Sequence, residues 1–235
     1  MSPPLTLYMY DTHMQSPMMV AVLGGTGRTG RPLVAELLRR GHKVVVLARD
    51  PAKLGMVRDE VQVITGDSRD EAALTELVSG ADAVVSTLGP VPGQGLINQD
   101  AAKALIFAMR RAGVRRYVGV TGAGIDVPGD HKAIFDKVLS KLIQLVSRKA
   151  ATDRAAEYQE WADSDLEWTL VRAPRLRDGP PTHAVEHDAH RSAPSPFLRR
   201  SDLAEFLVDV LEQGIYIRQA PLVGAKAVSD GPVPK

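Results

Sequence analysis

The sequence of 235 residues contains no cysteine, which excludes disulfide bonds and thiol chemistry and is consistent with a reducing compartment such as the cytoplasm. Neither charge is in excess: 29 Lys and Arg against 28 Asp and Glu leave a formal charge of +1, which gives no case for nucleic acid or an anionic membrane as a partner. No apolar run approaches the roughly 20 residues of a membrane span. Residues 1–17 lack the basic start and apolar block of a signal peptide, so we expect a disordered lead-in there.

With 44% hydrophobic residues the chain can bury a core, and its apolar runs alternate with segments of helical spacing. This alternation predicts an α/β fold, a Rossmann-type doubly wound parallel sheet with helices on both faces. We expect one domain over residues 18–226, with a small C-terminal substrate lobe, and a flexible tail at 227–235. The expected strands are 19–23, 42–47, 61–65, 83–88, 116–120, 167–172 and 215–223. The expected helices are 31–40, 70–78, 98–112, 131–148, 150–162 and 201–213. Ser201 or Asp202 is expected to cap the last helix.

The stretch GGTGRTG lies between the first expected strand and the first expected helix, which is the context of a dinucleotide-binding loop. Gly24 lets the chain turn off the strand, Gly27 lets a pyrophosphate approach the backbone, and Gly30 lets the helix pack closely. The N–H groups at the helix start attract the phosphates. The alternative is a glycine-rich turn that binds nothing, which the flanking strand and helix disfavour. The other loop residues expected at the cofactor are Thr26, Arg28 and Thr29.

The end of the second expected strand reads VVVLARD and indicates which dinucleotide is bound. Sites for NAD place an acidic residue there, whereas this sequence has Ala48 and Arg49, with Lys53 one helical turn later. The Arg49 guanidinium suits a 2′-phosphate, so we predict NADPH over NADH. Asp50 keeps NAD open as an alternative, and Arg49 as a solvated surface residue is another.

Two further turns follow expected strands at the edge where open α/β sheets bind ligands. Asp67 and Ser68, after the third strand, are placed to receive the adenine. Thr87, Leu88 and Gly89, after the fourth strand, are placed along the middle of the cofactor. For Asp67, capping of the following helix is an equally good interpretation.

Several motifs together carry a family resemblance: GGTGRTG, LARDPAKL at 47–54, STLGP at 86–90, VTGAG at 120–124, LEWTLVRAP at 166–174 and RRSDLAEF at 199–206. The chain resembles the atypical short-chain dehydrogenases/reductases, and within them the group of flavin reductase/biliverdin reductase B-like and NmrA-like proteins. The resemblance implies an NADP-dependent reductase, a monomer or weak dimer, that reduces planar conjugated acceptors such as flavins, quinones or tetrapyrroles. It also places Thr121 and Pro174 beside the cofactor.

The sequence departs from this pattern at three points. The superfamily's Tyr-x-x-x-Lys pair is absent, because Ala162 follows Tyr158 at that spacing, and the narrower group lacks the pair as well. That group has serine where this chain has Gly122 and histidine where it has Arg175. The departures leave a second hypothesis open, a non-catalytic NmrA-like protein that senses NADP(H). A nucleotide-sugar epimerase or isomerase is a third hypothesis, which the missing tyrosine disfavours.

Two residues are candidates for the chemistry of a reductase. Thr121 offers a hydroxyl for protonation, although a β-branched residue at the end of a strand is an equally good interpretation. Arg175, with Arg177 nearby, is placed to hold an anionic group of the acceptor, with a surface salt bridge as the alternative. Much of the rate of hydride transfer comes from positioning alone.

Three histidines lie within THAVEHDAHR, and on a helix two of them would share one face as in a metal site. The surrounding prolines argue against a helix, and hydride transfer needs no metal. We therefore expect no metal here and interpret His183, His187 and His190 as loop residues near the acceptor pocket. The amphipathic segment 131–148 is open to interpretation as a lid, a dimer contact or part of the core.

Overall fold

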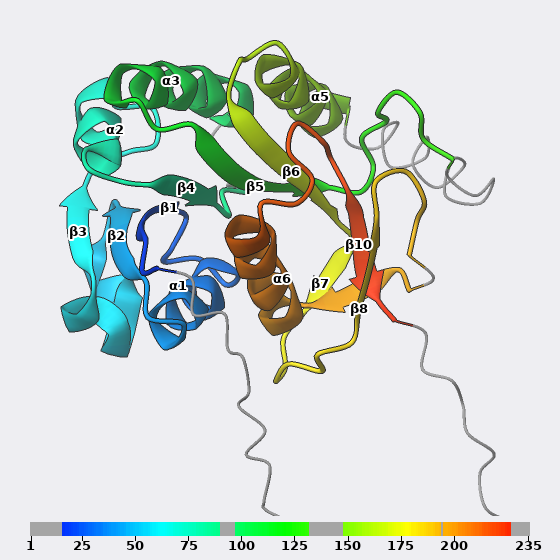
Figure 1. Cartoon of the computed structure of the whole chain (residues 1–235), viewed down its shortest axis with the longest axis horizontal. Coiled ribbons are helices and arrows are strands. Elements are labelled where there is room, and N and C mark those ends of the chain that lie inside the picture. Colours follow the sequence, from blue (N-terminus) through cyan, green and yellow to red (C-terminus); the bar gives the residue numbers. More distant parts are fainter. Residues whose placement is uncertain (1–15, 90–96, 132–147, 194, 227–235) are drawn as a thin grey trace, which may run out of the picture.

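The computed structural model describes residues 16–89, 97–131, 148–193 and 195–226, and within them an eight-stranded sheet forms the centre of the molecule (Figure 1). The strand order is β3-β2-β1-β4-β5-β6-β10-β8, with β8 antiparallel to β10 and all other neighbours parallel. This confirms the predicted doubly wound parallel sheet. The strands are β1 (Met19–Leu23), β2 (Lys43–Ala48), β3 (Gln62–Thr65), β4 (Ala83–Ser86), β5 (Arg116–Gly122), β6 (Glu167–Ala173), β8 (Val185–Asp188) and β10 (Leu222–Ala225).

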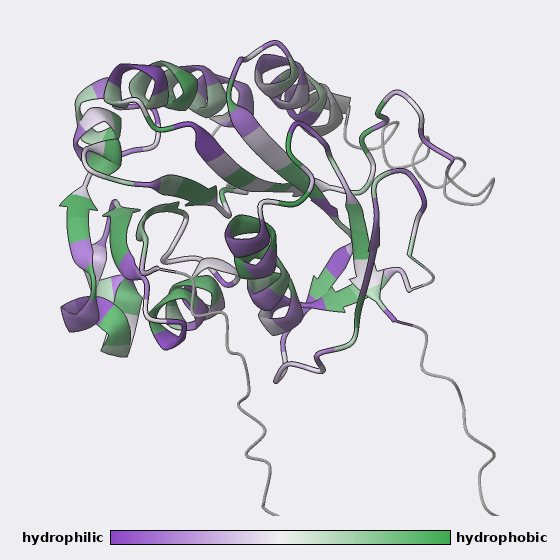
Figure 2. Ribbon diagram, in the orientation of Figure 1, coloured by the Kyte–Doolittle hydropathy of each residue, from purple (hydrophilic) through white to green (hydrophobic). Residues whose placement is uncertain are grey.

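Helices cover both faces of the sheet (Figure 1), as α1 (Gly30–Arg39) and α6 (Arg200–Gln213) on one face and α2 (Glu71–Val78), α3 (Ile97–Ala112) and α5 (Arg148–Ala162) on the other. Successive strand residues point to opposite faces, so β1 contributes to both cores. Val20 and Val22 pack with α1 and α6, whereas Ala21 and Leu23 pack with α2, α3 and α5. Figure 2 shows the resulting pattern, in which the central strands are largely hydrophobic and the helices are hydrophobic on their sheet-facing sides.

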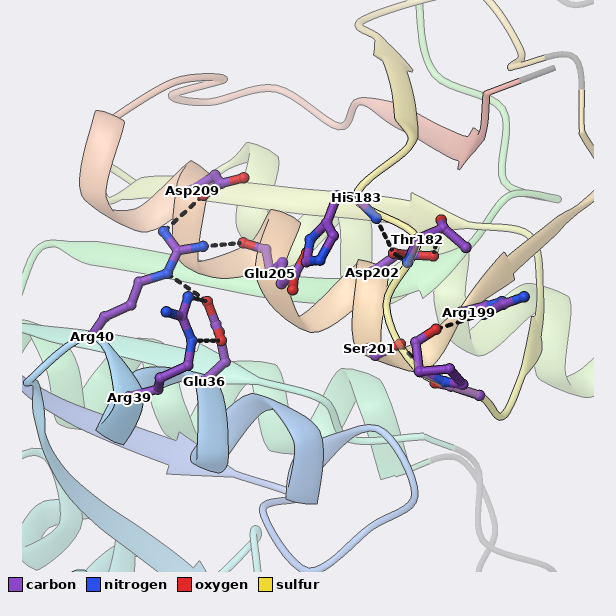
Figure 3. A network of polar contacts seen from close by, with 12 residues as sticks. Glu36, Arg39, Arg40, Thr182, His183, Arg199, Ser201, Asp202, Glu205 and Asp209 are labelled. Atoms are coloured by element: carbon purple, nitrogen blue, oxygen red, sulfur yellow. Dashed lines mark hydrogen bonds and ion pairs between the residues drawn. The ribbon is translucent and has the colours of Figure 1, made fainter. Parts of the chain in front are cut away.

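Ion pairs join the two helices of the first face. Arg40, directly after α1, contacts Asp209 of α6 at 2.7 Å and Glu36 of α1 at 2.6 Å (Figure 3). It also contacts Glu212 of α6 at 2.5 Å. Arg40 is mostly buried, and its side chain is therefore screened less than an exposed one. The pairs hold the C-terminal helix α6 against the first helix of the dinucleotide-binding unit.

The prediction that Ser201 or Asp202 caps α6 is wrong. The helix begins at Arg200 without a side-chain cap, and Asp202 is fully buried. Its carboxylate accepts hydrogen bonds from the backbone N–H groups of Thr182 and His183, at 2.5 and 3.0 Å, while the Ser201 hydroxyl donates to the Gly179 carbonyl (Figure 3). Both side chains satisfy polar groups of a distant loop that would otherwise be unpaired.

Three short strands occur between the strand expected at 167–172 and the helix expected at 201–213, where no strand was predicted. They are β7 (Arg175–Arg177), β9 (Phe197–Arg199), which pairs with β7 in a second sheet, and β8. Short 3₁₀ turns also cover Pro51–Glu60 and are interrupted at Gly55, where the backbone is not helical. Of the strand expected at 215–223, only the last two residues form a strand, as the start of β10. The sequences of these three strands, RLR, VEHD and FLR, carry too few apolar residues to be recognised as strands, because their pairing with a distant partner determines them.

The segment 131–148 falls almost entirely outside the described residues, as do the expected lead-in and tail. None of the helices in the described ranges is both long and apolar enough to cross a membrane.

Candidate functional site

The site lies where the strand order reverses, because connections leave β1 and β4 toward opposite faces and open a crevice at the strand ends. Gly24, directly after β1, has φ +76°, a conformation that favours glycine. A Cβ there would lie 2.9 Å from the Thr87 carbonyl carbon, directly after β4. The Thr87 N–H donates to the Leu23 carbonyl at 3.0 Å, so the two turns are fixed against each other.

The rest of the glycine loop is equally close to its own backbone. A Cβ on Gly30 would clash with the Gly24 carbonyl group, so the start of α1 packs against the turn itself, not only against the sheet. Gly27 has a different environment: a Cβ added there would have one described atom within 4 Å, the Gly24 carbonyl oxygen at 3.1 Å. Its Cα therefore leaves room for a ligand at the helix N-terminus.

A cavity of about 480 Å³ opens beside this loop. It is bounded on one side by the loop and the end of β4, and on the other by the ends of β5 and β6 and by α5. Its lining residues are Gly27, Arg28, Thr29, Thr87, Leu88, Gly89, Asn98, Val120, Thr121, Gly122, Arg154, Glu157, Ala173, Pro174, Leu176 and Arg200.

A smaller hollow of about 80 Å³ lies on the far side of the loop and shares Leu88 with the cavity. Gly24, Thr26, Arg49, Asp67, Ser68 and Arg69 are among the residues that line it. Two hollows joined across a glycine loop fit a dinucleotide, one for each nucleotide half.

The second cationic residue of the smaller hollow is not the one predicted from the sequence. The Asp67 carboxylate accepts from the backbone and guanidinium of Arg69 at 3.1 and 2.9 Å and lies 4.0 Å from Arg49. These arginines, Arg69 first, lower the pKa of Asp67. Helix α2 is capped by Asp70, not by Asp67. Lys53 lies 3.5 Å from Asp50 and is not among the lining residues, so the second cation at the hollow is Arg69.

Polar side chains line the cavity opposite the glycine loop. Thr121 is buried, and its hydroxyl has no hydrogen-bond partner within the described ranges. The guanidinium of Arg154, from α5, lies where a side chain on Gly122 would begin. Glycine at this position is therefore what admits the arginine to the cavity.

Glu157 lies one turn further along α5 and is only 8% exposed. Burial, and to a smaller extent the Asp153 carboxylate, raise the pKa of the Glu157 carboxyl to about 8, against the opposing effect of Arg154. Asp153 is held in place because its two carboxylate oxygens accept from the Asn98 and Gln99 N–H groups, at 3.2 and 3.1 Å, at the start of α3. The fold thus places a protonated carboxyl in the cavity wall near neutral pH.

A carboxylate bridges two cationic residues of the cavity. Asp178 lies 2.6 Å from Arg28 of the glycine loop and 2.8 Å from Arg200 at the start of α6. This bridge links the loop to the segment after β7.

Most of the predicted site residues lie in the linings of the two hollows, and three do not: Gly30, Lys53 and Arg175. Arg175 is exposed on β7 because side chains alternate along a strand and Leu176 takes the inward position. Sequence reasoning missed Asn98, Arg69, Arg154, Glu157 and Arg200. The acidic pair at i and i+4 on an expected helix, with an arginine between, was the available signal for the α5 residues.

Within 16–89, 97–131, 148–193 and 195–226, the three histidines belong to no group of side chains that could hold a metal ion. His183, before β8, contacts Glu205 at 2.8 Å, and His187, within β8, contacts the Tyr216 hydroxyl at 2.7 Å.

The sequence matches the NAD(P)H-binding protein family over residues 24–214. It is 33% identical over 202 residues to the isoflavone reductase homolog IRL of Zea mays, an alignment that covers 80% of this chain and 62% of the maize protein. The chain spans less than two thirds of the length of the curated relatives that it matches.

Two solved structures share the fold. One is ChuY, an anaerobillin reductase of Escherichia coli O157:H7, with a TM-score of 0.75 and 19% identity over 91% of this chain and 100% of that one. The other is a short-chain dehydrogenase/reductase of Veillonella parvula in complex with NADP, with a TM-score of 0.73 and 18% identity over 90% of this chain and 96% of that one. At these identities they bear on the fold alone.

Proposed function

The chain belongs to the NAD(P)H-binding protein family, and we propose that it is an NADPH-dependent reductase that transfers hydride to a flavin, a quinone or a similar conjugated acceptor. The observation that carries the proposal is the cavity beside the glycine loop, which is large enough for both a nicotinamide and a planar acceptor.

The lining of the cavity suits an acceptor with a flat apolar body and an anionic edge. Leu88, Val120 and Leu176 supply apolar surface. Arg154 is half-buried and makes no ion pair or hydrogen bond with the described residues, so its guanidinium is available to a carboxylate or phosphate. We therefore assign to Arg154 the anion-holding role that the sequence suggested for Arg175.

The cofactor preference rests on the smaller hollow. Arg49 and Arg69 provide two cations there against the single carboxylate of Asp67, a balance that favours the 2′-phosphate of NADPH over the free hydroxyl of NADH. When bound, the cofactor supplies a hydride.

The chain's own residues position the reactants. The glycine loop and the turn after β4 hold the cofactor, and the walls of the cavity hold the acceptor beside it. Thr121 presents a buried hydroxyl to the cavity and orients a polar atom of the acceptor or of the nicotinamide.

The test follows NADPH absorbance in the near ultraviolet with purified protein while FMN, a quinone or biliverdin is added. Protein-dependent oxidation that saturates with one acceptor supports the reductase and identifies the acceptor class. NADPH binding without oxidation, detected as quenched tryptophan fluorescence, supports the alternative of a non-catalytic NADP(H) sensor, which the absent Tyr-x-x-x-Lys pair favours.

A further inference from the structure

We propose that Glu157 is the proton donor of the reduction, an assignment that rests on the proposed reductase function. Glu157 lines the same cavity as the glycine loop, is almost fully buried, and accepts no hydrogen bond from the described part of the chain. A buried glutamate that lines a cavity, and that has no hydrogen-bond partner among the described residues, has its hydrogen-bonding capacity available for a ligand.

Elimination among the lining residues points to the same group. The other charged side chains described there are the guanidinium groups of Arg28, Arg154 and Arg200, and a guanidinium group serves as a hydrogen-bond donor and not as an acid. The Thr29, Thr87 and Thr121 hydroxyls hold their protons too tightly to be a source on their own. Glu157 is thus the one described lining residue that gives up a proton near neutral pH.

The surroundings of Glu157 keep that proton in place. On α5, the fixed Asp153 carboxylate disfavours a second negative charge and Arg154 favours it, with burial the dominant effect, so the pKa of Glu157 is about 8. From β5, the Tyr117 phenol is fully buried, stacked on Trp161 at 3.6 Å, and its pKa is raised by burial, so it stays neutral. From α3, the nearby side chain in the lining is the uncharged Asn98.

The reaction balances with one proton from this residue. The acceptor receives a hydride, two electrons and one proton, from the bound dihydronicotinamide, and the displaced electron pair moves to its oxygen or nitrogen. The Glu157 O–H bond breaks and the proton bonds to that atom, which leaves a carboxylate beside Arg154. Solvent then returns a proton to the carboxylate, so each turnover oxidises one NADPH, reduces one acceptor and consumes one proton.

The decisive variant is Glu157→Gln, which keeps the size and polarity of the side chain but carries no acidic proton. With NADPH and a naphthoquinone, we expect wild-type kcat/KM to fall above about pH 8 and the variant to be about 100-fold slower at neutral pH without that fall. Glu157→Asp, which restores an acid, should recover part of the rate. Glu160→Gln makes the same change on the same helix outside the cavity lining, and it should behave as wild type.

Two measurements without turnover complete the test. NADPH affinity from tryptophan quenching should be unchanged in Glu157→Gln, and ¹³C NMR of the free protein should show a glutamate carboxyl that titrates near pH 8 in wild type and is absent from the variant. Wild-type turnover and pH profile in Glu157→Gln would overturn the donor assignment and leave the reductase standing. Weakened NADPH binding in the variant would make Glu157 a structural residue. NADPH binding without oxidation by wild type would remove the reductase and the donor together.

Discussion

The two walls of the cavity are built by different means. The glycine-loop wall consists of backbone within seven consecutive residues, and its geometry depends on side chains being absent. The opposite wall consists of side chains from β5, β6, α5 and α6, which lie as far as 80 positions apart in the sequence. A backbone site can be recognised in a local motif, whereas a side-chain site exists only after the fold has brought its members together.

The largest effect is expected from a methyl group added to the backbone wall. In Gly30→Ala the new Cβ would clash with the Gly24 carbonyl, in backbone that cannot move without opening the turn against Thr87. We expect loss of NADPH binding and a decrease of about 3 kcal/mol or more in unfolding free energy, measured by tryptophan quenching and urea denaturation.

The matched control is Gly124→Ala, where no described atom lies within 4 Å of the added Cβ and φ is not in the left-handed region. It should keep cofactor affinity and change stability by about 0.5 kcal/mol or less. NADPH affinity retained in Gly30→Ala would mean that the loop is not the backbone cradle described above.

Sequence reasoning reached the backbone wall for the same physical reason. Periodic apolar runs predicted the parallel sheet, and GGTGRTG between a strand and a helix predicted the turn at Gly24. It did not reach β8, whose strand character depends on pairing with β10, or Asp202, whose partners lie about 20 residues away. It also placed the acceptor-side cation on Arg175, because local spacing does not say which of two neighbouring strand residues points inward.

In the side-chain wall, Glu157 is expected to make the stability of the protein depend on pH. The Glu157 carboxyl titrates at about 8 when folded and at its ordinary 4.5 when unfolded, so the unfolded chain releases a proton that the folded chain keeps. Stability conferred by the protonated residue is full below about 4.5, falls as pH rises to about 8, and is constant above. Glu157→Gln removes this dependence.

Urea denaturation below pH 4.5 and above pH 8 measures this pH dependence of the unfolding free energy. Relative to wild type, Glu157→Gln should gain up to about 5 kcal/mol of unfolding free energy between acidic and alkaline pH, since one pKa unit corresponds to about 1.4 kcal/mol. Parallel curves for the two proteins would show that Glu157 is ionised in the fold, and the donor assignment would lose its physical basis.

A smaller effect is expected for acceptor binding. In Gly122→Ser the new side chain would occupy the place of the Arg154 guanidinium and displace it, although the charge remains in the protein. Both this variant and Arg154→Ala should raise KM for an anionic acceptor by about 10- to 100-fold, the loss of one charge-assisted hydrogen bond, and affect a neutral quinone less.

Arg175→Ala decides between the two assignments of the cation. From its exposed position we expect no more than a twofold change in KM for either acceptor. A larger effect in Arg175→Ala than in Arg154→Ala would mean that Arg175 binds the anionic group of the acceptor. The acceptor side of the cavity would then be predictable from local sequence, as the glycine loop is.

The smallest effect is expected for Arg49, which combines features of the two walls. Like the glycine loop it directly follows a predicted strand, and like the opposite wall it acts through its side chain. It is half exposed and lies 4.0 Å from Asp67, so solvent and that carboxylate both weaken its attraction for a phosphate. Arg49→Ala should reduce the preference for NADPH over NADH by about tenfold, whereas Lys53→Ala, outside the hollow and beside Asp50, should leave it within about twofold. Tryptophan-quenching titrations with both cofactors measure the preference directly. Equal affinity of wild type for NADPH and NADH would remove the NADPH assignment. A larger effect of Lys53→Ala than of Arg49→Ala would mean that Lys53, which lies outside the lining of the hollow, is the residue that binds the 2′-phosphate.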